Sequence, residues 1–180
     1  MTLIATTIPD VVLVETKIFT DERGSFYESW NQQEMIGLGV DHRFVQDNFS
    51  QSRKGVLRGL HYQIRHPQGK LVRVVAGEVF DVAVDLRKSS PTFGKWVGFV
   101  LSGESGRMAW IPPGFAHGFY VLSQKADLLY KTTDHWYPQF ERTLLWNDST
   151  IGIDWPLEGR PLLAAKDQEG TSFSEVETFD

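Results

Sequence analysis

The stretch "GVLRGLHYQ", residues 55–63, places an arginine, a histidine and two glycines within an otherwise apolar run. Polar side chains that point into an apolar core are costly unless they are paired. The run therefore raises the question of what Arg58 and His61 bind. A second stretch, "WIPPGFAHGF" at residues 110–119, sets His117 behind a proline-glycine turn and is followed by an aromatic strand.

The 180-residue chain is long enough for one domain with a sizeable core. Its 41% hydrophobic and 23% charged residues are typical of a globular protein. A net charge of -5 excludes a general basic field for nucleic acid or an anionic membrane, so a bound anion needs a local cluster of arginine and lysine. The absence of cysteine excludes disulfides, thiolate zinc sites and a cysteine nucleophile.

Short runs of β-branched and aromatic residues, separated by turns, predict strands within residues 11–19, 42–52, 70–86, 95–102, 106–112, 117–123, 126–133 and 142–148. One short helix is expected over residues 29–39, capped by Ser29 and ended by glycine. This pattern favours an all-β antiparallel sandwich or barrel, with a jelly roll as the leading form. We expect a single domain over residues 1–180, with a C-terminal tail from about residue 157 packed over the barrel.

The first 19 residues lack the basic segment of a signal peptide, and Pro9, Asp10 and Glu15 interrupt their apolar run. We therefore expect no signal peptide, no membrane span and a cytoplasmic location. No phosphate-binding glycine loop, nucleophile-elbow serine or paired-histidine zinc helix is present.

What remains is a set of polar residues within strand-like sequence: Arg58, His61, Lys70, Arg73, Asp81, Asp85, His117, Tyr130 and Lys131. Taken singly, each has a plain structural interpretation. Basic residues can lie along a solvated sheet face, aspartates that alternate with valines can occupy its wet side, and a tyrosine can be an ordinary strand aromatic. For His42, His66 and His135 we retain the interpretation of hydrogen-bonded core or rim residues.

Together these residues resemble a known family. Pro112, Gly114 and His117 resemble the second motif of the cupin superfamily, a double-stranded β-helix barrel. The first cupin motif carries two histidines and a glutamate in metal-binding members, whereas here His61 is followed by Gln63. Such a broken ligand set is poor for a divalent transition metal, so we expect no metal and no cofactor.

The match narrows with "DERGSFYESW", "GVLRGLHYQ", "WIPPGFAHGF" and "YKTTDHWYP". These stretches resemble the dTDP-4-dehydrorhamnose 3,5-epimerase family over residues 10–156. The resemblance implies an isomerase of the cupin-type jelly-roll fold, acting in dTDP-L-rhamnose biosynthesis for cell-surface polysaccharide. It would invert C3 and C5 of dTDP-4-dehydro-6-deoxy-D-glucose to give dTDP-4-dehydro-L-rhamnose.

The reaction needs a base on one face of the sugar, an acid on the other and a positive or hydrogen-bond-donating group at the ketone oxygen. His61 is the natural base, because histidine titrates near neutral pH. The resemblance implies Asp167 as its partner and Tyr130 as the acid. We expect Lys70 to stabilise the enolate and to lower the pKa of the Tyr130 phenol. By resemblance, Asp81 and His117 lie in the same cavity.

The resemblance also implies the residues that bind the nucleotide. Arg58 would contact phosphate. The glycine at position 59 fits a place where the backbone must approach a ligand closely. Arg23 and Glu28 would come from the neighbouring subunit of a homodimer through an exchanged N-terminal strand. The remaining candidates for substrate binding are Gln46, Asp47, Asn48, Tyr137, Glu141 and Lys166, with Glu28 and Glu141 at the thymidine and Tyr137 or a neighbouring aromatic stacked on the base.

Two departures from the family pattern stand out: His135 replaces the usual aromatic, and residues 162–173, which hold Lys166 and Asp167, match only loosely. Two further functions remain open. One is a single-carbon epimerase or 3,4-ketoisomerase acting on a dTDP-4-keto-deoxysugar. The other is a non-catalytic cupin that binds sugar nucleotides. A metal-dependent dioxygenase is disfavoured by the incomplete ligand set.

Overall fold

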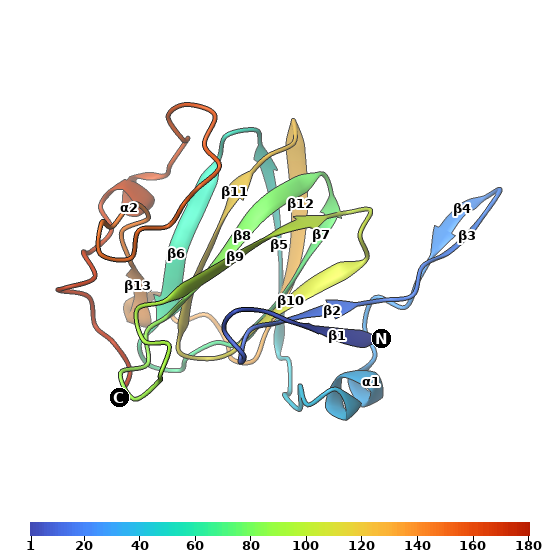
Figure 1. The fold of residues 1–180 in the computed structure, drawn as a ribbon, viewed down its shortest axis with the longest axis horizontal. Helices are drawn as coiled ribbons and strands as arrows, with labels where there is room; N and C mark the ends of the chain where they lie inside the picture. The colour runs from blue at the N-terminus through green and yellow to red at the C-terminus, as the bar shows by residue number, and fades with distance from the viewer.

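Two antiparallel sheets face one another in the computed structural model, which describes residues 1–180 (Figure 1). The first has six strands in the order β1 (Thr2–Ala5), β2 (Val12–Glu15), β10 (Arg107–Ile111), β7 (Lys70–Ala76), β12 (Lys125–Thr132) and β5 (Gln46–Arg53). The second has five in the order β13 (Glu141–Thr143), β6 (Leu57–Gln63), β11 (Phe115–Val121), β8 (Glu78–Asp85) and β9 (Trp96–Ser102). The predicted all-β sandwich is confirmed.

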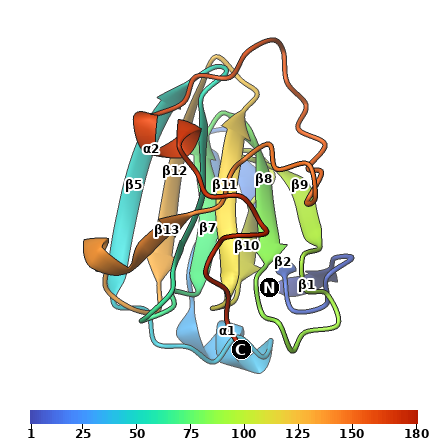
Figure 2. The same cartoon turned by 90° about the vertical axis from the view of Figure 1, so that its left-hand side faces the viewer.

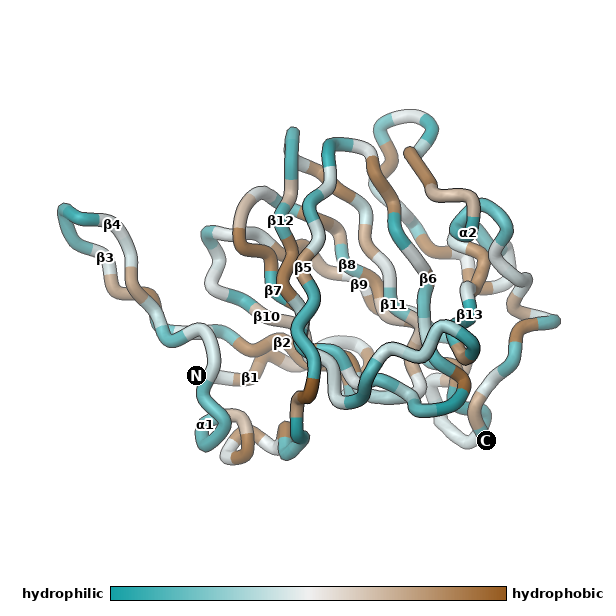
Figure 3. The backbone as a smooth tube through the Cα atoms, turned by 180° about the vertical axis from the view of Figure 1, so that it is seen from behind, coloured by the Kyte–Doolittle hydropathy of each residue, from teal (hydrophilic) through white to brown (hydrophobic).

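The remaining elements lie outside this sandwich. Strands β3 (Phe19–Asp21) and β4 (Gly24–Phe26) form a hairpin that projects from the body as an arm with a hydrophilic tip (Figures 1 and 3). The helices are short: α1 (Gln32–Gly37), the 3-10 helix η1 (Pro138–Phe140) and α2 (Ala165–Gln168). None of them has the length and apolar character that a membrane-spanning helix requires.

Three apolar clusters hold the layers together. The largest lies between the sheets and includes Val72, Leu128 and Phe119. Because successive strand residues point to opposite faces, Tyr120 next to Phe119 joins a second cluster on the outer face of the five-stranded sheet. The third cluster packs Met35 of α1 against the outer face of the six-stranded sheet.

The C-terminal segment covers the outer face of the five-stranded sheet (Figure 2). Parallel bridges join it to the body at Val56 with Leu162, at Leu144 with Thr171 and at Arg87 with Phe179. Between these bridges, α2 contacts β6, the strand that holds Arg58 and His61.

The structure corrects two boundaries. The helix predicted over residues 29–39 begins only at Gln32, and Asn31 rather than Ser29 caps it, because the Asn31 Oδ1 accepts the backbone N–H groups of Gln33 and Glu34. The strand predicted from residue 42 begins at Gln46.

Candidate active site

A cavity of about 360 Å³ opens between the two sheets beside the C-terminal tail. Most of the predicted site residues line it. Those found there are Gln46, Asn48, Arg58, His61, Lys70, His117, Tyr130, Glu141, Lys166 and Asp167.

Arg58 and His61 both line this cavity from the same strand, β6, although they are three residues apart. Side chains with an odd spacing on a regular strand point to opposite faces. Here His117 of β11 pairs with His61, whereas Phe119 pairs with Arg58, so β6 holds one extra residue between the two pairs. This bulge brings the guanidinium and the imidazole to one side.

Gly59 lies in this bulge, and it approaches backbone rather than ligand. A Cβ atom at Gly59 would lie 2.6 Å from the Cα atom of Gly118 and 2.6 Å from the carbonyl oxygen of His117. The expectation that Gly59 serves a ligand is therefore corrected: the glycine allows β6 and β11 to pack closely.

His61 is paired with Asp167 of α2, at 2.5 Å between Nε2 and Oδ1. The Asp167 side chain is buried, whereas that of His61 remains 23% exposed toward the cavity. Burial lowers the pKa of His61 below its ordinary value, and the Asp167 hydrogen bond opposes part of this shift. The imidazole is therefore neutral near pH 7 and can accept a proton.

A second buried dyad stands next to the first. His117 is the cross-strand partner of His61, and its Nε2 atom lies 2.9 Å from the Asp81 Oδ2 atom. Asp81 itself does not line the cavity, and its carboxylate is bonded to the His117 ring. Two imidazoles, each with its own carboxylate, thus lie side by side on the five-stranded sheet.

Lys70 reaches from the six-stranded sheet to β6, where its Nζ atom donates to the His61 carbonyl oxygen at 3.0 Å. Burial lowers the pKa of Lys70 to about 8, although Glu141 and Asp81 act in the opposite direction. The ammonium is therefore buried beside the histidine and loses its charge in mildly alkaline solution.

Tyr130 lies on β12, in the sheet that faces His61 across the cavity. Burial raises the pKa of the Tyr130 phenol and Glu141 adds to the effect, while Arg58 lowers it. The expectation that Lys70 lowers this pKa is wrong, because burial dominates and the cation that acts on the phenol is Arg58. A protonated phenol suits a proton donor.

The polar residues of β5 alternate between two sides. Gln46 and Asn48 line the cavity, where the Gln46 Nε2 donates to the Asn48 Oδ1 at 2.9 Å. Asp47 points to the outer face and pairs with Lys131 at 3.0 Å, so its side chain does not line the cavity. The same alternation brings in Ser50, which the sequence analysis missed; its buried hydroxyl has no hydrogen-bond partner.

Two basic side chains at the cavity, Arg58 and Lys166, each bond to one side chain of the protein. Arg58 Nε donates to the Ser52 Oγ at 3.0 Å, and Lys166 Nζ pairs with Glu141 at 3.0 Å. Two cations thus lie where an anion can bind.

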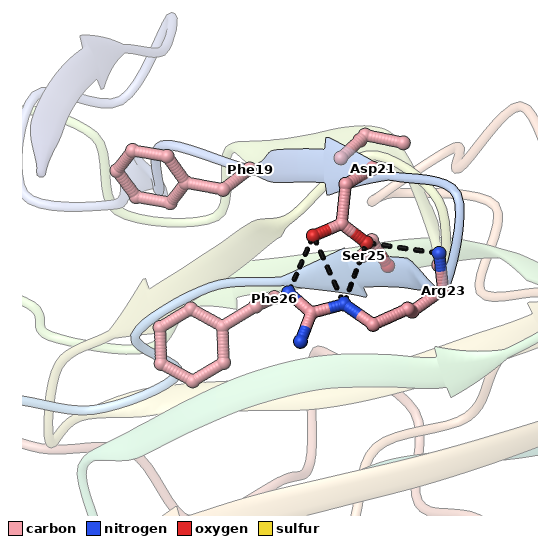
Figure 4. A pocket seen from close by; sticks show the side chains of 7 residues that line it. Phe19, Asp21, Arg23, Ser25 and Phe26 are labelled. Atoms are coloured by element: carbon pink, nitrogen blue, oxygen red, sulfur yellow. Dashed lines mark hydrogen bonds and ion pairs between the residues drawn. The ribbon is translucent and has the colours of Figure 1, made fainter.

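Arg23 and Glu28 lie outside the cavity. Arg23 caps the β3–β4 arm and binds Asp21 through Nε and Nη2, as Figure 4 shows. The hollow of about 460 Å³ at this hairpin is open and is flanked by Phe19 and Phe26, the latter 73% exposed. Glu28 follows the arm and accepts a hydrogen bond from Asn31. Within one chain, the arm points away from the body (Figure 1).

Tyr137 lies at the rim of the cavity rather than in its lining. The His66 ring packs on its ring with centroids 4.6 Å apart, and the Phe140 ring makes a tilted contact with centroids 6.3 Å apart. His135 was noted in the sequence because it replaces an aromatic residue. The imidazole that packs on the Tyr137 ring, however, is that of His66. Trp136 and Gln68 also line the cavity, and no spacing in the sequence marked them.

Comparison with known proteins accounts for this arrangement. The family model for dTDP-4-dehydrorhamnose 3,5-epimerase matches residues 5–175. The chain belongs to this family. Its sequence is 59% identical over 175 residues to the dTDP-4-dehydrorhamnose 3,5-epimerase of Pseudomonas aeruginosa, covering 96% of each chain.

Solved structures of the family share the fold. The Legionella pneumophila 3,5-epimerase, in complex with dTDP-4-keto-L-rhamnose, is 54% identical with a TM-score of 0.95, covering 98% of this chain and 94% of that chain. A 3'-monoepimerase from Streptomyces bikiniensis, in complex with dTDP-quinovose, is 29% identical with a TM-score of 0.88 over 94% and 87% of the two chains.

Family membership confirms three predictions: the cupin-type jelly roll, the isomerase class and the epimerase function on a dTDP-sugar of rhamnose biosynthesis. The alternatives of a non-catalytic cupin and a dioxygenase are set aside. No three His, Asp or Glu side chains lie together in an arrangement that could hold a metal ion.

Proposed function

We propose that this 3,5-epimerase inverts C3 and C5 of dTDP-4-dehydro-6-deoxy-D-glucose with His61 as base and Tyr130 as acid. One observation carries the assignment. A neutral imidazole backed by a buried carboxylate stands on one sheet, and a protonated phenol stands on the facing sheet. A sugar held between the sheets would meet the base on one face and the acid on the other.

In each half of the reaction His61 removes the proton from the carbon next to the C4 ketone. The C–H electron pair forms a double bond to C4, and the π pair of the carbonyl moves to its oxygen, which becomes an enolate oxygen. The Lys70 ammonium, buried beside the His61 carbonyl, stabilises this charge in a site of low polarity. Asp167 stabilises the imidazolium that forms on His61.

Inversion requires that the new proton arrive from the opposite face. Tyr130 supplies it, the C–H bond forms on that face and the carbonyl is restored. The phenolate regains a proton from solvent and His61 releases its own, so the enzyme returns to its starting state. The same cycle at C3 and at C5 gives dTDP-4-dehydro-L-rhamnose. His117, backed by Asp81, lines the same cavity and would contact the sugar.

The nucleotide is proposed to lie toward the mouth of the cavity. Arg58 and Lys166 provide cations for the pyrophosphate, and Gln46 and Asn48 add neutral donors. Glu141 would contact the thymidine and Tyr137 would stack on the base. Asp47 would contact the substrate only through its backbone, because its side chain points outward and pairs with Lys131.

A second copy of the chain is proposed to complete the site. Phe19 and Phe26 are 54% and 73% exposed on an arm that projects from the body of its own chain (Figure 1). Exposed aromatic surface of this kind is typical of an interface. In the proposed homodimer, the exchanged segment carries Arg23 and Glu28 into the neighbour's cavity. A cytoplasmic location remains part of this proposal.

Proton exchange in deuterated water tests the division of roles. His61→Asn should abolish deuterium entry at both C3 and C5, because no enolate forms. Tyr130→Phe should still exchange but invert little, since His61 returns deuterium to the original face. Losses of roughly 10²- to 10⁴-fold are expected for a general base or acid. His42→Asn, an exposed histidine remote from the cavity, serves as the control.

Normal inversion by Tyr130→Phe, or normal exchange by His61→Asn, would show that the roles are wrongly assigned. The wild-type pattern also separates the remaining alternative. Deuterium at both carbons supports the double inversion, and deuterium at C3 alone would indicate a single-carbon epimerase.

A further inference from the structure

The segment between β12 and η1 is held by two glutamines from opposite sheets. The backbone N–H of Trp136 donates to the Oε1 atom of Gln46 on β5 at 3.1 Å. The next N–H, that of Tyr137, donates to the Oε1 atom of Gln63 on β6 at 2.6 Å. Successive peptide groups thus attach the segment to both walls of the cavity.

Both donors and one acceptor position of the Gln63 amide are used for this attachment. The residue is 2% exposed. Its Nε2 group donates to the His66 carbonyl oxygen at 2.7 Å and to the His135 carbonyl oxygen at 3.2 Å. The side chain therefore makes three hydrogen bonds, all to backbone, and joins both His66 and the segment of His135 and Tyr137 to β6.

These bonds determine where the Tyr137 ring lies. Gln63 holds the backbone of His66 and the backbone of Tyr137, and the two rings stack with an interplanar angle of 35°. The His66 Nδ1 atom also lies 3.3 Å from the Asp134 Oδ2 atom, which belongs to the same segment. One buried amide thus fixes both members of the aromatic pair.

We propose that Gln63 is a positioning residue for the nucleotide end of the substrate, which acts by holding Tyr137 at the rim of the cavity. This inference rests on the proposed function, in which Tyr137 stacks on the base. Backbone groups take both Nε2 donors of Gln63 and one lone pair of its Oε1 atom, so its loss affects nucleotide binding more than the chemical step.

Gln63→Glu is the sharpest variant, because it keeps the shape of the side chain and removes only the Nε2 donors. Two backbone carbonyls then face a carboxylate. We expect dTDP to bind about ten-fold or more weakly and KM to rise by a similar factor, with kcat changed by less than about two-fold. Gln124→Glu, the same change at an exposed glutamine, should leave both quantities unaltered.

A double-mutant cycle shows whether the effect runs through Tyr137. In a Tyr137→Leu background, Gln63→Glu should add little to the loss of dTDP affinity. If Gln63→Glu fails to fold, Gln63→Met provides the same comparison with an apolar side chain of similar length.

The proposal is overturned if the Gln63 variants bind dTDP as the wild type does, if kcat falls while KM is unchanged, or if the loss is undiminished in the Tyr137→Leu background. Failure of the wild-type protein itself to bind dTDP would instead refute the proposed function.

Discussion

Arg58 and His61 reach the same cavity from one strand because a bulge lies between them. The bulge depends on the contact between Gly59 and Gly118, whose backbones are too close for a Cβ atom. A single backbone irregularity thus sets the distance between the proposed anion-binding group and the proposed base.

Gly59→Ala should therefore damage both stability and activity. The backbone at Gly59 has a φ of +117°, which a residue with a Cβ atom rarely adopts, and the new atom would meet the backbone of Gly118 at 2.6 Å. We expect a loss of more than about 2 kcal/mol in the free energy of unfolding, measured by chemical denaturation. Gly159→Ala, with a φ of +90° and open space around it, should cost about 1 kcal/mol. Equal losses at the two positions would contradict the packing argument.

Asp167→Asn should weaken the base and move the acid limb of the pH–rate profile. The carboxylate raises the pKa of His61, so its removal lowers that pKa, and the imidazole stays neutral to lower pH. We expect kcat/KM to fall roughly 10²-fold and the acid limb to shift to lower pH. The exposed Asp154→Asn variant is the control. A shift of the limb to higher pH would be inconsistent with the proposed pair.

The alkaline limb is expected to report Lys70. The pKa of this ammonium is about 8, so its stabilising charge is present below that pH and is lost as the pH rises through it. Activity should therefore decline above about pH 8. In Lys70→Met, kcat should be low throughout and this limb should disappear, whereas the exposed Lys88→Met should keep the wild-type profile. An unchanged limb in Lys70→Met would assign it to another group.

Complementation between two inactive variants tests the exchanged arm. Arg23→Ala impairs the arm but leaves the cavity intact, and His61→Asn does the reverse. In a mixed dimer with exchanged arms, one of the two sites combines an intact cavity with an intact arm. Unfolding and refolding an equal mixture should therefore restore about a quarter of the wild-type activity. A mixture that stays inactive, or a fully active monomer in solution, would rule the exchange out.

Exhaustive chelation should leave the reaction rate unchanged. All the groups proposed for proton transfer and charge stabilisation are side chains of this chain: His61, Asp167, Lys70 and Tyr130. The measurement is epimerisation after dialysis against a strong chelator. Activity that disappears and returns with one divalent metal would contradict the assignment.

Much of this architecture was predictable from local sequence. Short runs of β-branched and aromatic residues between turns indicate strands, since such side chains pack well on a pleated sheet. That rule located β7, β8 and β12, and the cupin-like motif around His117 indicated the barrel. The family resemblance then assigned Asp167 and Tyr130 to a shared site, although nothing in their spacing does so.

Other features depended on contacts between distant segments. The bulge in β6 exists only because β11 lies beside it, so no reading of residues 55–63 alone could place Arg58 and His61 together. The pKa of Tyr130 rises rather than falls because burial outweighs the effect of the Arg58 charge. In the sequence, Gln63 stands only as the residue that replaces a histidine ligand of metal-binding cupins.

Only the tertiary structure shows that Gln63 binds a segment more than 70 residues away. The difference has one physical reason. The chain's own alternation and turn residues determine strands and the face each side chain occupies. Which groups share a cavity, and how far burial shifts their protonation, depend on what the folded chain brings against them.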